Sequence, residues 1–154
     1  MLINPIFASH IEAVPKLFAL LKEATPFIEK GVATQRKRAG IYVFFENDVP
    51  QHVGRTRNLQ QRLRGHITAS HYTATYAFKM ARRHLGLPVT YNTVGGRGQL
   101  QNDPVFRPEF LRQIERVKAM QVRFVDITDP VHQYLVELYA HLEYGLPLDE
   151  FDTH

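Results

Sequence analysis

Residues 40–66, GIYVFFENDVPQHVGRTRNLQQRLRGH, constrain the fold more than any other segment. The first part, GIYVFFE, is apolar and rich in β-branched and aromatic residues, which predicts a largely buried strand. The turn residues of ENDVPQ separate it from a second short strand, HVG, and strands joined by so short a turn pair antiparallel. A helix is predicted directly afterwards, over 58–68, with Asn58 as its N-cap.

The rest of the chain predicts further helices and one more strand. Helices are expected over 8–30, 72–85, 108–118 and 130–145, a strand at QVRFVDI, and a long loop over 86–107. Pro130 at the first helical position and Gly145 at the end define the last helix. The predicted fold class is α/β of the α+β kind: a small three-stranded, mainly antiparallel sheet flanked by helices, in a single domain over 1–154.

Composition excludes several classes of protein. The 154 residues include no cysteine, which rules out disulfides and cysteine-ligated zinc and is compatible with a reducing cytoplasm. No run of 18 apolar residues occurs, so no membrane span is expected. The predicted location is cytoplasmic, and no membrane partner is predicted.

The charge is unevenly distributed along the chain. Residues 49–102 contain no Asp or Glu but eight Arg and Lys, whereas the part after Phe124 contains seven acids and no Arg or Lys. A basic segment of this length suggests a surface for a polyanion, most simply nucleic acid. The alternative is a solvated basic face without a partner.

Two helices carry candidate functional side chains. Arg62 and His66 lie four residues apart on helix 58–68, close to its apolar stripe, where they either project into a cleft or serve as boundary residues. On helix 130–145 the expected buried side consists of Val131, Tyr134, Leu135, Leu138 and Leu142. Glu137 lies beside that stripe and needs an arginine, a metal ion or exposure to solvent; Glu143, on the opposite flank, is the second choice.

Taken together, these residues resemble the GIY-YIG nuclease family. The resemblance rests on GIY, on HVG ten residues after its tyrosine, on R-T-x-N-L-x-x-R-L-x-x-H, and on a late helical glutamate. It is best over 40–67 and weaker over 121–149. It implies a nuclease domain, built on a three-stranded antiparallel sheet with flanking helices, that cuts DNA phosphodiester bonds. The segments outside the resemblance are then an N-terminal helical extension, 1–39, and a basic insertion, 68–107.

The resemblance also implies roles for single residues. It assigns Tyr42 to the activation of water, Arg62 to the scissile phosphate, His66 to the same catalytic site, and Glu137 to one Mg²⁺ or Mn²⁺ ion. The family's second tyrosine is His52 here, a histidine that either takes over proton transfer or marks a weakened enzyme. A family asparagine falls near Asp149, so that amide is missing or displaced.

The predicted function is that of a metal-dependent endonuclease acting on DNA, with RNA as an alternative substrate. The expected nucleic-acid contacts are Arg55, Arg57, Arg64, Arg82, Arg83 and Arg97. Two other functions stay open: a nucleic-acid-binding module that has lost catalysis, and a small-molecule enzyme. The sequence does not indicate the oligomeric state.

Two geometric expectations follow from the nuclease interpretation. The first is that Tyr42, His52, Arg62, His66 and Glu137 converge on one concave surface. The second is that strand pairing places His52 directly beside Tyr42.

Overall fold

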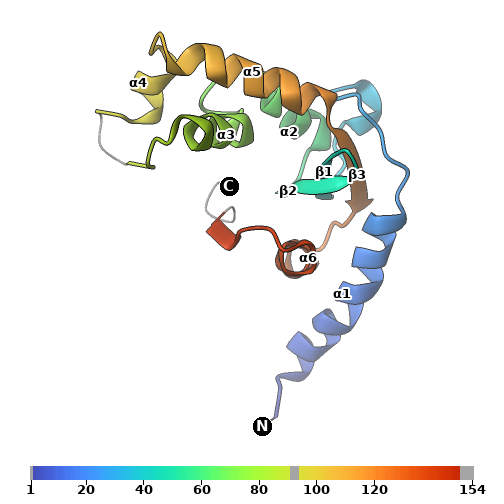
Figure 1. Ribbon diagram of the computed structural model, residues 1–154. Helices are drawn as coiled ribbons and strands as arrows, with labels where there is room; N and C mark the ends of the chain where they lie inside the picture. Colours follow the sequence, from blue (N-terminus) through green and yellow to red (C-terminus); the bar gives the residue numbers. More distant parts are fainter. Residues whose placement is uncertain (1, 91–93, 150–154) are drawn as a thin grey trace.

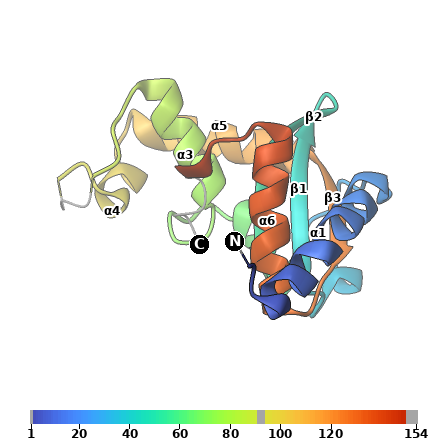
Figure 2. The same cartoon turned by 90° about the horizontal axis from the view of Figure 1, so that it is seen from below.

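The computed structural model describes residues 2–90 and 94–149, and Figures 1 and 2 show three layers with a small sheet in the middle. The elements, in chain order, are α1 (Pro5–Glu23), the short 3₁₀ turn η1 (Ala33–Gln35), β1 (Gly40–Glu46), β2 (Val49–Thr56), α2 (Leu59–His66), α3 (Thr75–Leu85), α4 (Arg97–Gln101), α5 (Phe106–Ala119), β3 (Gln121–Asp126) and α6 (Pro130–Tyr144).

The sheet has the strand order β2-β1-β3, and both pairs are antiparallel, which confirms the predicted fold class. The β1–β2 hairpin turns at Asn47 and Asp48, which have φ values of 51° and 63°. Asn and Asp tolerate this left-handed conformation better than most residues, and turns with two positive φ values match the twist of a hairpin. The hairpin makes β2 an edge strand, where Pro50 is tolerated because its missing N–H removes no inner hydrogen bond.

Alternate residues of β1 enter two separate cores. Tyr42 and Phe44 pack with side chains of α2, α3 and α5 in a mainly aromatic cluster, which we call the aromatic core. Ile41 and Val43 pack with side chains of α1 and α6 in a second cluster, which we call the aliphatic core. Because neighbouring residues of a strand point to opposite faces, the aromatic and aliphatic cores lie on opposite sides of the sheet.

Both segments expected to be additions contribute to the cores. Val14, Phe18 and Leu21 of α1 are buried in the aliphatic core. The segment 68–107 supplies α3, whose aromatic and small side chains form much of the aromatic core. It also contains α4, so the prediction of an unbroken loop over 86–107 is wrong at 97–101.

The N-terminal helix differs from the predicted range 8–30. It begins at Pro5, because the side chain of Asn4 accepts hydrogen bonds from the N–H groups of Ile6 and Phe7 and so caps it. It ends at Glu23, because Pro26 disfavours a helical conformation at the residue before it. Phe27 instead pairs with Val122 through two backbone hydrogen bonds. No helix within the described ranges is both long and apolar enough to cross a membrane.

Candidate functional site

Three of the predicted catalytic side chains meet on the aromatic side of the sheet. The hydroxyl oxygen of Tyr42 lies 2.7 Å from Nε2 of His66. Arg62 Nε donates a hydrogen bond of 3.1 Å to the same oxygen, and another N–H of Arg62 donates to Oγ1 of Thr75 at 3.3 Å. Tyr42 therefore links the two polar residues that α2 presents at i, i+4 spacing, and we call these three residues the Tyr42 triad.

His66 is held neutral in this triad. Burial lowers the pKa of the imidazole well below its usual range, and the positive charge of Arg62 acts in the same direction. With Arg62 donating to the Tyr42 oxygen, the phenol proton is free to be donated to Nε2 of His66. The imidazole proton is then on Nδ1, the nitrogen for which no described group is a hydrogen-bond partner.

Gly54 makes room for the tyrosine. It faces Tyr42 across the strand pair, and a Cβ atom at this position would overlap Cζ and the hydroxyl oxygen of the tyrosine ring. The glycine of the HVG motif therefore has a packing role, since any side chain there would displace the ring from His66 and Arg62.

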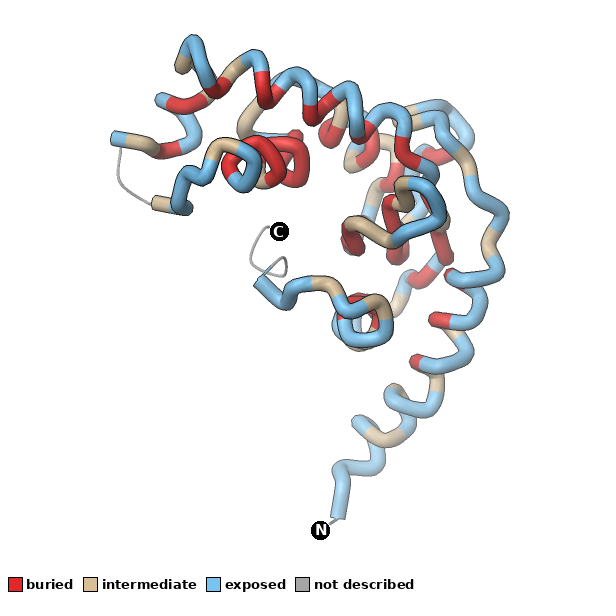
Figure 3. The backbone as a smooth tube through the Cα atoms, viewed as in Figure 1, coloured by how far each residue is buried: buried red, intermediate tan, exposed pale blue. Residues whose placement is uncertain are grey.

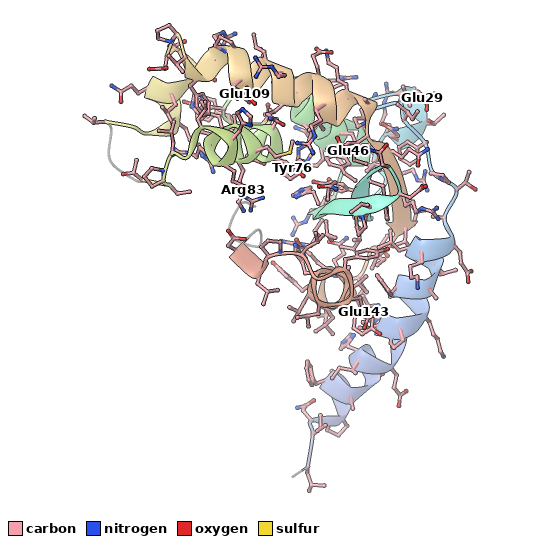
Figure 4. All side chains as sticks on the ribbon, in the orientation of Figure 1. Glu29, Glu46, Tyr76, Arg83, Glu109 and Glu143 are labelled. Carbon is pink, nitrogen blue, oxygen red and sulfur yellow. The ribbon has the colours of Figure 1, made fainter. Side chains whose placement is uncertain are left out.

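His52 lies in the same core but not directly beside Tyr42. Its cross-strand partner is Phe44, whereas Tyr42 pairs with Gly54, so the expected direct pairing of His52 with Tyr42 is wrong by two residues in the register. The His52 ring stacks on Tyr76 of α3 with centroids 4.5 Å apart, and its centroid is 6.0 Å from that of Tyr42 and 5.5 Å from that of His66. Figure 4 shows Tyr76 between α3 and the sheet. His52 is thus a buried neighbour of the triad.

Glu137 lies on the other side of the sheet, so the expectation that all five residues share one surface is wrong. It is fully buried on α6, whose neighbours Val136 and Ala140 belong to the aliphatic core. Its Oε2 lies 3.5 Å from Nε of Arg55, which pairs with Ile41 in the sheet and so points to the aliphatic side. The Arg55 guanidinium also lies over the Tyr134 ring, 4.0 Å from its centroid.

The orientation of α6 explains the position of Glu137. Figure 3 shows much of α6 in the colour of exposed residues. Most of the apolar stripe that was expected to be buried is among these exposed residues. Val131, Tyr134, Leu138 and Leu142 are 42%, 54%, 40% and 61% exposed. The opposite side of α6 is buried because Val136 and Ala140 are small enough for close packing. The polar residues on that side have partners. Gln133 donates a hydrogen bond to the carbonyl of Ile127, and His141 Nδ1 lies 2.8 Å from the carbonyl oxygen of Glu137.

The surroundings of Glu137 do not fit a bound Mg²⁺ ion. Magnesium needs oxygen ligands and open coordination positions, but this carboxylate is buried and a guanidinium lies 3.5 Å from it. Over residues 2–90 and 94–149, Glu137 belongs to no cluster of three or more His, Asp or Glu side chains close enough to hold an ion. The expected asparagine position is occupied by Asp149, which pairs with Lys79 at 3.7 Å and Arg83 at 3.9 Å.

A basic hollow adjoins the triad at the end of β2. A cavity of about 420 Å³ is lined by Arg55, Thr56, Arg57, Asn58, Gln61, Arg62, Gly65 and Thr73. A second hollow, of about 220 Å³, is lined by Arg55, Thr56, Arg57 and Tyr134. The two hollows share residues 55–57 and therefore adjoin each other at the edge of the sheet. Arg62 lines the first hollow on the aromatic side of the sheet, and the Arg55–Glu137 pair lies on the aliphatic side.

No protein-family model, no curated protein and no solved structure matches this chain. What the site does must therefore be inferred from its residues and their geometry.

The predicted nucleic-acid contacts are distributed over different surfaces. Arg55 and Arg57 line the basic hollow, and Arg64 is exposed on α2 while donating to the carbonyl of Gly31 at 3.0 Å. Arg83 and Arg97 are exposed on α3 and α4. Figure 4 shows Arg83 on the side of α3 that faces α6.

Arg82 is a correction to that set of contacts. Its side chain is buried and donates to the carbonyl oxygens of Pro88 and Gly95 at 2.6 and 3.4 Å, which ties the segment after α3 to the helix. A guanidinium used in this way supports the fold. It is not available to a phosphate.

Proposed function

We propose that this protein is an endonuclease of the GIY-YIG type, which hydrolyses DNA phosphodiester bonds in the basic hollow at the end of β2. The observation that carries the proposal is the hydrogen-bonded Tyr42 triad, whose arginine lines that hollow. Arginine N–H groups match phosphate oxygens in geometry and charge. Arg62 uses some of its N–H groups on Tyr42 and Thr75, and its others are directed to the phosphate.

Proton transfer is assigned to Tyr42 and His66. A tyrosine alone is a poor base, because at its reference pKa only about one molecule in 10³ is ionised at pH 7. A neutral His66 at 2.7 Å accepts the phenol proton while the tyrosine oxygen takes a proton from the attacking water. The water oxygen bonds to phosphorus as the bond from phosphorus to the leaving sugar oxygen breaks, and the leaving oxygen takes a proton from solvent. Arg62 stabilises the negative charge that develops on the phosphate. Since Tyr42 is fully buried, substrate binding has to open the wall of the hollow next to it.

The predicted Mg²⁺ or Mn²⁺ dependence has no part in these steps. The single carboxylate assigned to it, Glu137, is paired with Arg55 on the other side of the sheet. Metal dependence is therefore a separate question for experiment.

Supercoiled plasmid tests the proposal. We expect the protein to nick it, and Arg62→Ala to lower the rate by about 10²–10³-fold, the usual loss on removing one donor that stabilises transition-state charge. Reactions with Mg²⁺, Mn²⁺ or EDTA measure metal dependence. Lys16→Ala, which removes one positive charge from an exposed position on α1, is the matched control and should cut like the wild type.

A nucleic-acid-binding module without catalysis is the second candidate function. The burial of Tyr42 and the separation of Glu137 from the triad favour it. In that case Arg57 and Arg62 bind backbone phosphates and no bond is cut. Binding of duplex DNA that weakens steeply with salt, with no cleavage under any metal, would decide for the module. A protein that neither binds nor cuts would favour the small-molecule enzyme.

A further inference from the structure

A second group of titratable side chains, none of which lines the basic hollow, lies where α1 meets the start of α6. His10 comes from α1, and Asp129 and His132 come from the first turn of α6 and its cap. One potential ligand atom from each lies within 4.8 Å of the other two, and the two imidazole rings meet edge to face with centroids 4.9 Å apart. Figure 2 shows the first half of α1 beside this end of α6.

We propose that His10, Asp129 and His132 form a binding site for a divalent transition metal, with Zn²⁺ as the ion that fits best. Two imidazole nitrogens and one carboxylate oxygen are typical ligands of zinc, whereas Mg²⁺ and Ca²⁺ require mostly oxygen. Three protein ligands leave a fourth tetrahedral position for water. All three side chains are partly exposed, so the ion enters directly from solvent.

Asp129 is already oriented for such a role. One of its carboxylate oxygens, Oδ1, accepts hydrogen bonds from the N–H groups of Val131 and His132 at 2.8 and 3.1 Å, which fixes the carboxylate as the N-cap of α6. Oδ2 is then the oxygen that binds the metal. Hydrogen bonds of this kind commonly orient metal ligands.

Two features of the geometry have to be overcome. Around a tetrahedral ion with bonds of about 2.0–2.2 Å, ligand atoms lie roughly 3.4 Å apart, so ligand atoms that lie up to 4.8 Å apart must approach by up to about 1.4 Å. Rotations of the two partly exposed imidazole rings provide that movement. The positive end of the α6 dipole opposes a cation, but the charge of Asp129 lies between them and compensates.

The site has a structural consequence for α1. The buried contacts of this helix come from Val14, Phe18 and Leu21, whereas its first turn exposes Ile6 and Phe7, which are 71% and 47% exposed. His10 lies between these two parts. A metal shared by His10 and α6 therefore fixes the half of α1 that apolar packing leaves weakly attached.

Zinc titration of tag-free protein against a chromogenic chelator tests the site. We expect one tight Zn²⁺ per chain, and at least about 10–100-fold weaker binding in His10→Gln, His132→Gln and Asp129→Asn. Asparagine caps a helix as well as aspartate does, so Asp129→Asn removes the ligand charge and keeps the cap. The controls are His84→Gln, at an exposed histidine of α3, and Glu137→Gln, and both should bind Zn²⁺ like the wild type.

Two further readouts distinguish a site from an adventitious ion. Zinc, but not Mg²⁺, should raise the Tm of the wild type and leave that of the His10→Gln/His132→Gln double variant unchanged. Amide exchange in residues 6–13 should slow on zinc addition. Equal zinc affinity in the wild type and the double variant, or loss of binding in His84→Gln, overturns the proposal. The site is independent of nuclease activity, so neither result bears on the Tyr42 triad.

Discussion

The two faces of the sheet bury polar groups in different ways. On the aromatic face the buried groups of the triad are a phenol and a neutral imidazole, joined by hydrogen bonds. On the aliphatic face a charged carboxylate, Glu137, is compensated by the guanidinium of Arg55. Burying an ionised group costs far more than burying a neutral one unless a partner compensates it. The aromatic face therefore holds a neutral pair, Tyr42 and His66, that is suited to proton transfer. The aliphatic face holds an ion pair with a structural role.

Arg55 of β2 and Arg62 of α2, which both line the basic hollow, differ for the same reason. Arg55 has a carboxylate as its neighbour, so its charge is largely neutralised before any ligand arrives. Arg62 contacts two hydroxyl groups and keeps its full charge at the wall of the hollow. An incoming phosphate is therefore attracted chiefly to the triad side of the edge strand.

The largest effect on stability is expected from Gly54→Ala. The added methyl group overlaps the Tyr42 ring, which is surrounded by the aromatic core and cannot move without disturbing it, so we expect a loss of about 3 kcal/mol in the free energy of unfolding. Gly98→Ala on α4 is the matched control, because no atom lies within 4 Å of the added carbon, and it should be neutral or slightly stabilising. Urea denaturation measures the unfolding free energy of the two variants. Equal midpoints for Gly54→Ala and Gly98→Ala would show that the Tyr42 ring is not packed tightly against residue 54.

A smaller loss is expected when the ion pair on the aliphatic face is broken. Glu137→Gln leaves Arg55 beside a neutral amide, and because the Arg55 side chain is 18% exposed, we expect a loss of about 2 kcal/mol. In a double-mutant cycle with Arg55→Gln, the two losses should be less than additive. Plasmid nicking by Glu137→Gln should stay close to the wild-type rate. A folded variant that no longer cuts would show that Glu137 acts in catalysis after all, as the sequence resemblance implies.

The predicted proximity of site residues is confirmed where the residues are close in sequence. Tyr42, Arg62 and His66 come from one strand–turn–strand–helix unit, and helix periodicity brings the last two together. Arg82 was assigned wrongly because its partners are backbone carbonyls of a loop, which no pattern of side chains reveals. Isolated motifs thus identified the triad but not the residues that support the fold around it.

The orientation of α6 could not be read from its sequence. Apolar residues occur on both of its sides, so periodicity favoured the stripe with the larger side chains, Tyr134, Leu138 and Leu142. Close approach to the sheet instead selected Val136 and Ala140, and Arg55 provided the partner that allows Glu137 to be buried. Tertiary packing therefore overrode the local pattern.

The smallest expected effect is a change of the unfolding free energy with pH that comes from His66 on the aromatic face. The pKa of His66 is lowered in the folded state, so the unfolded chain binds the extra proton and stability falls as pH drops below about 6.5, the reference value. The contribution of His66 should fall by about 1 kcal/mol between pH 6.5 and 5.5, because the unfolded imidazole is already half protonated at pH 6.5. The difference in unfolding free energy between the wild type and His66→Gln isolates it from the other histidines. A difference that does not change with pH would mean that His66 is charged in the folded protein.

The contact between Gly54 and the Tyr42 ring has a consequence for divergence of the sequence. Only the absence of a side chain at 54 leaves space for the ring at 42, so the two positions, twelve residues apart, cannot vary independently. A descendant that replaces the tyrosine by a small residue gains space to restore a side chain at 54, whereas the reverse order of changes passes through an unstable intermediate. Tyrosine and glycine should therefore be retained or lost as a pair, and the loss of the tyrosine should come first.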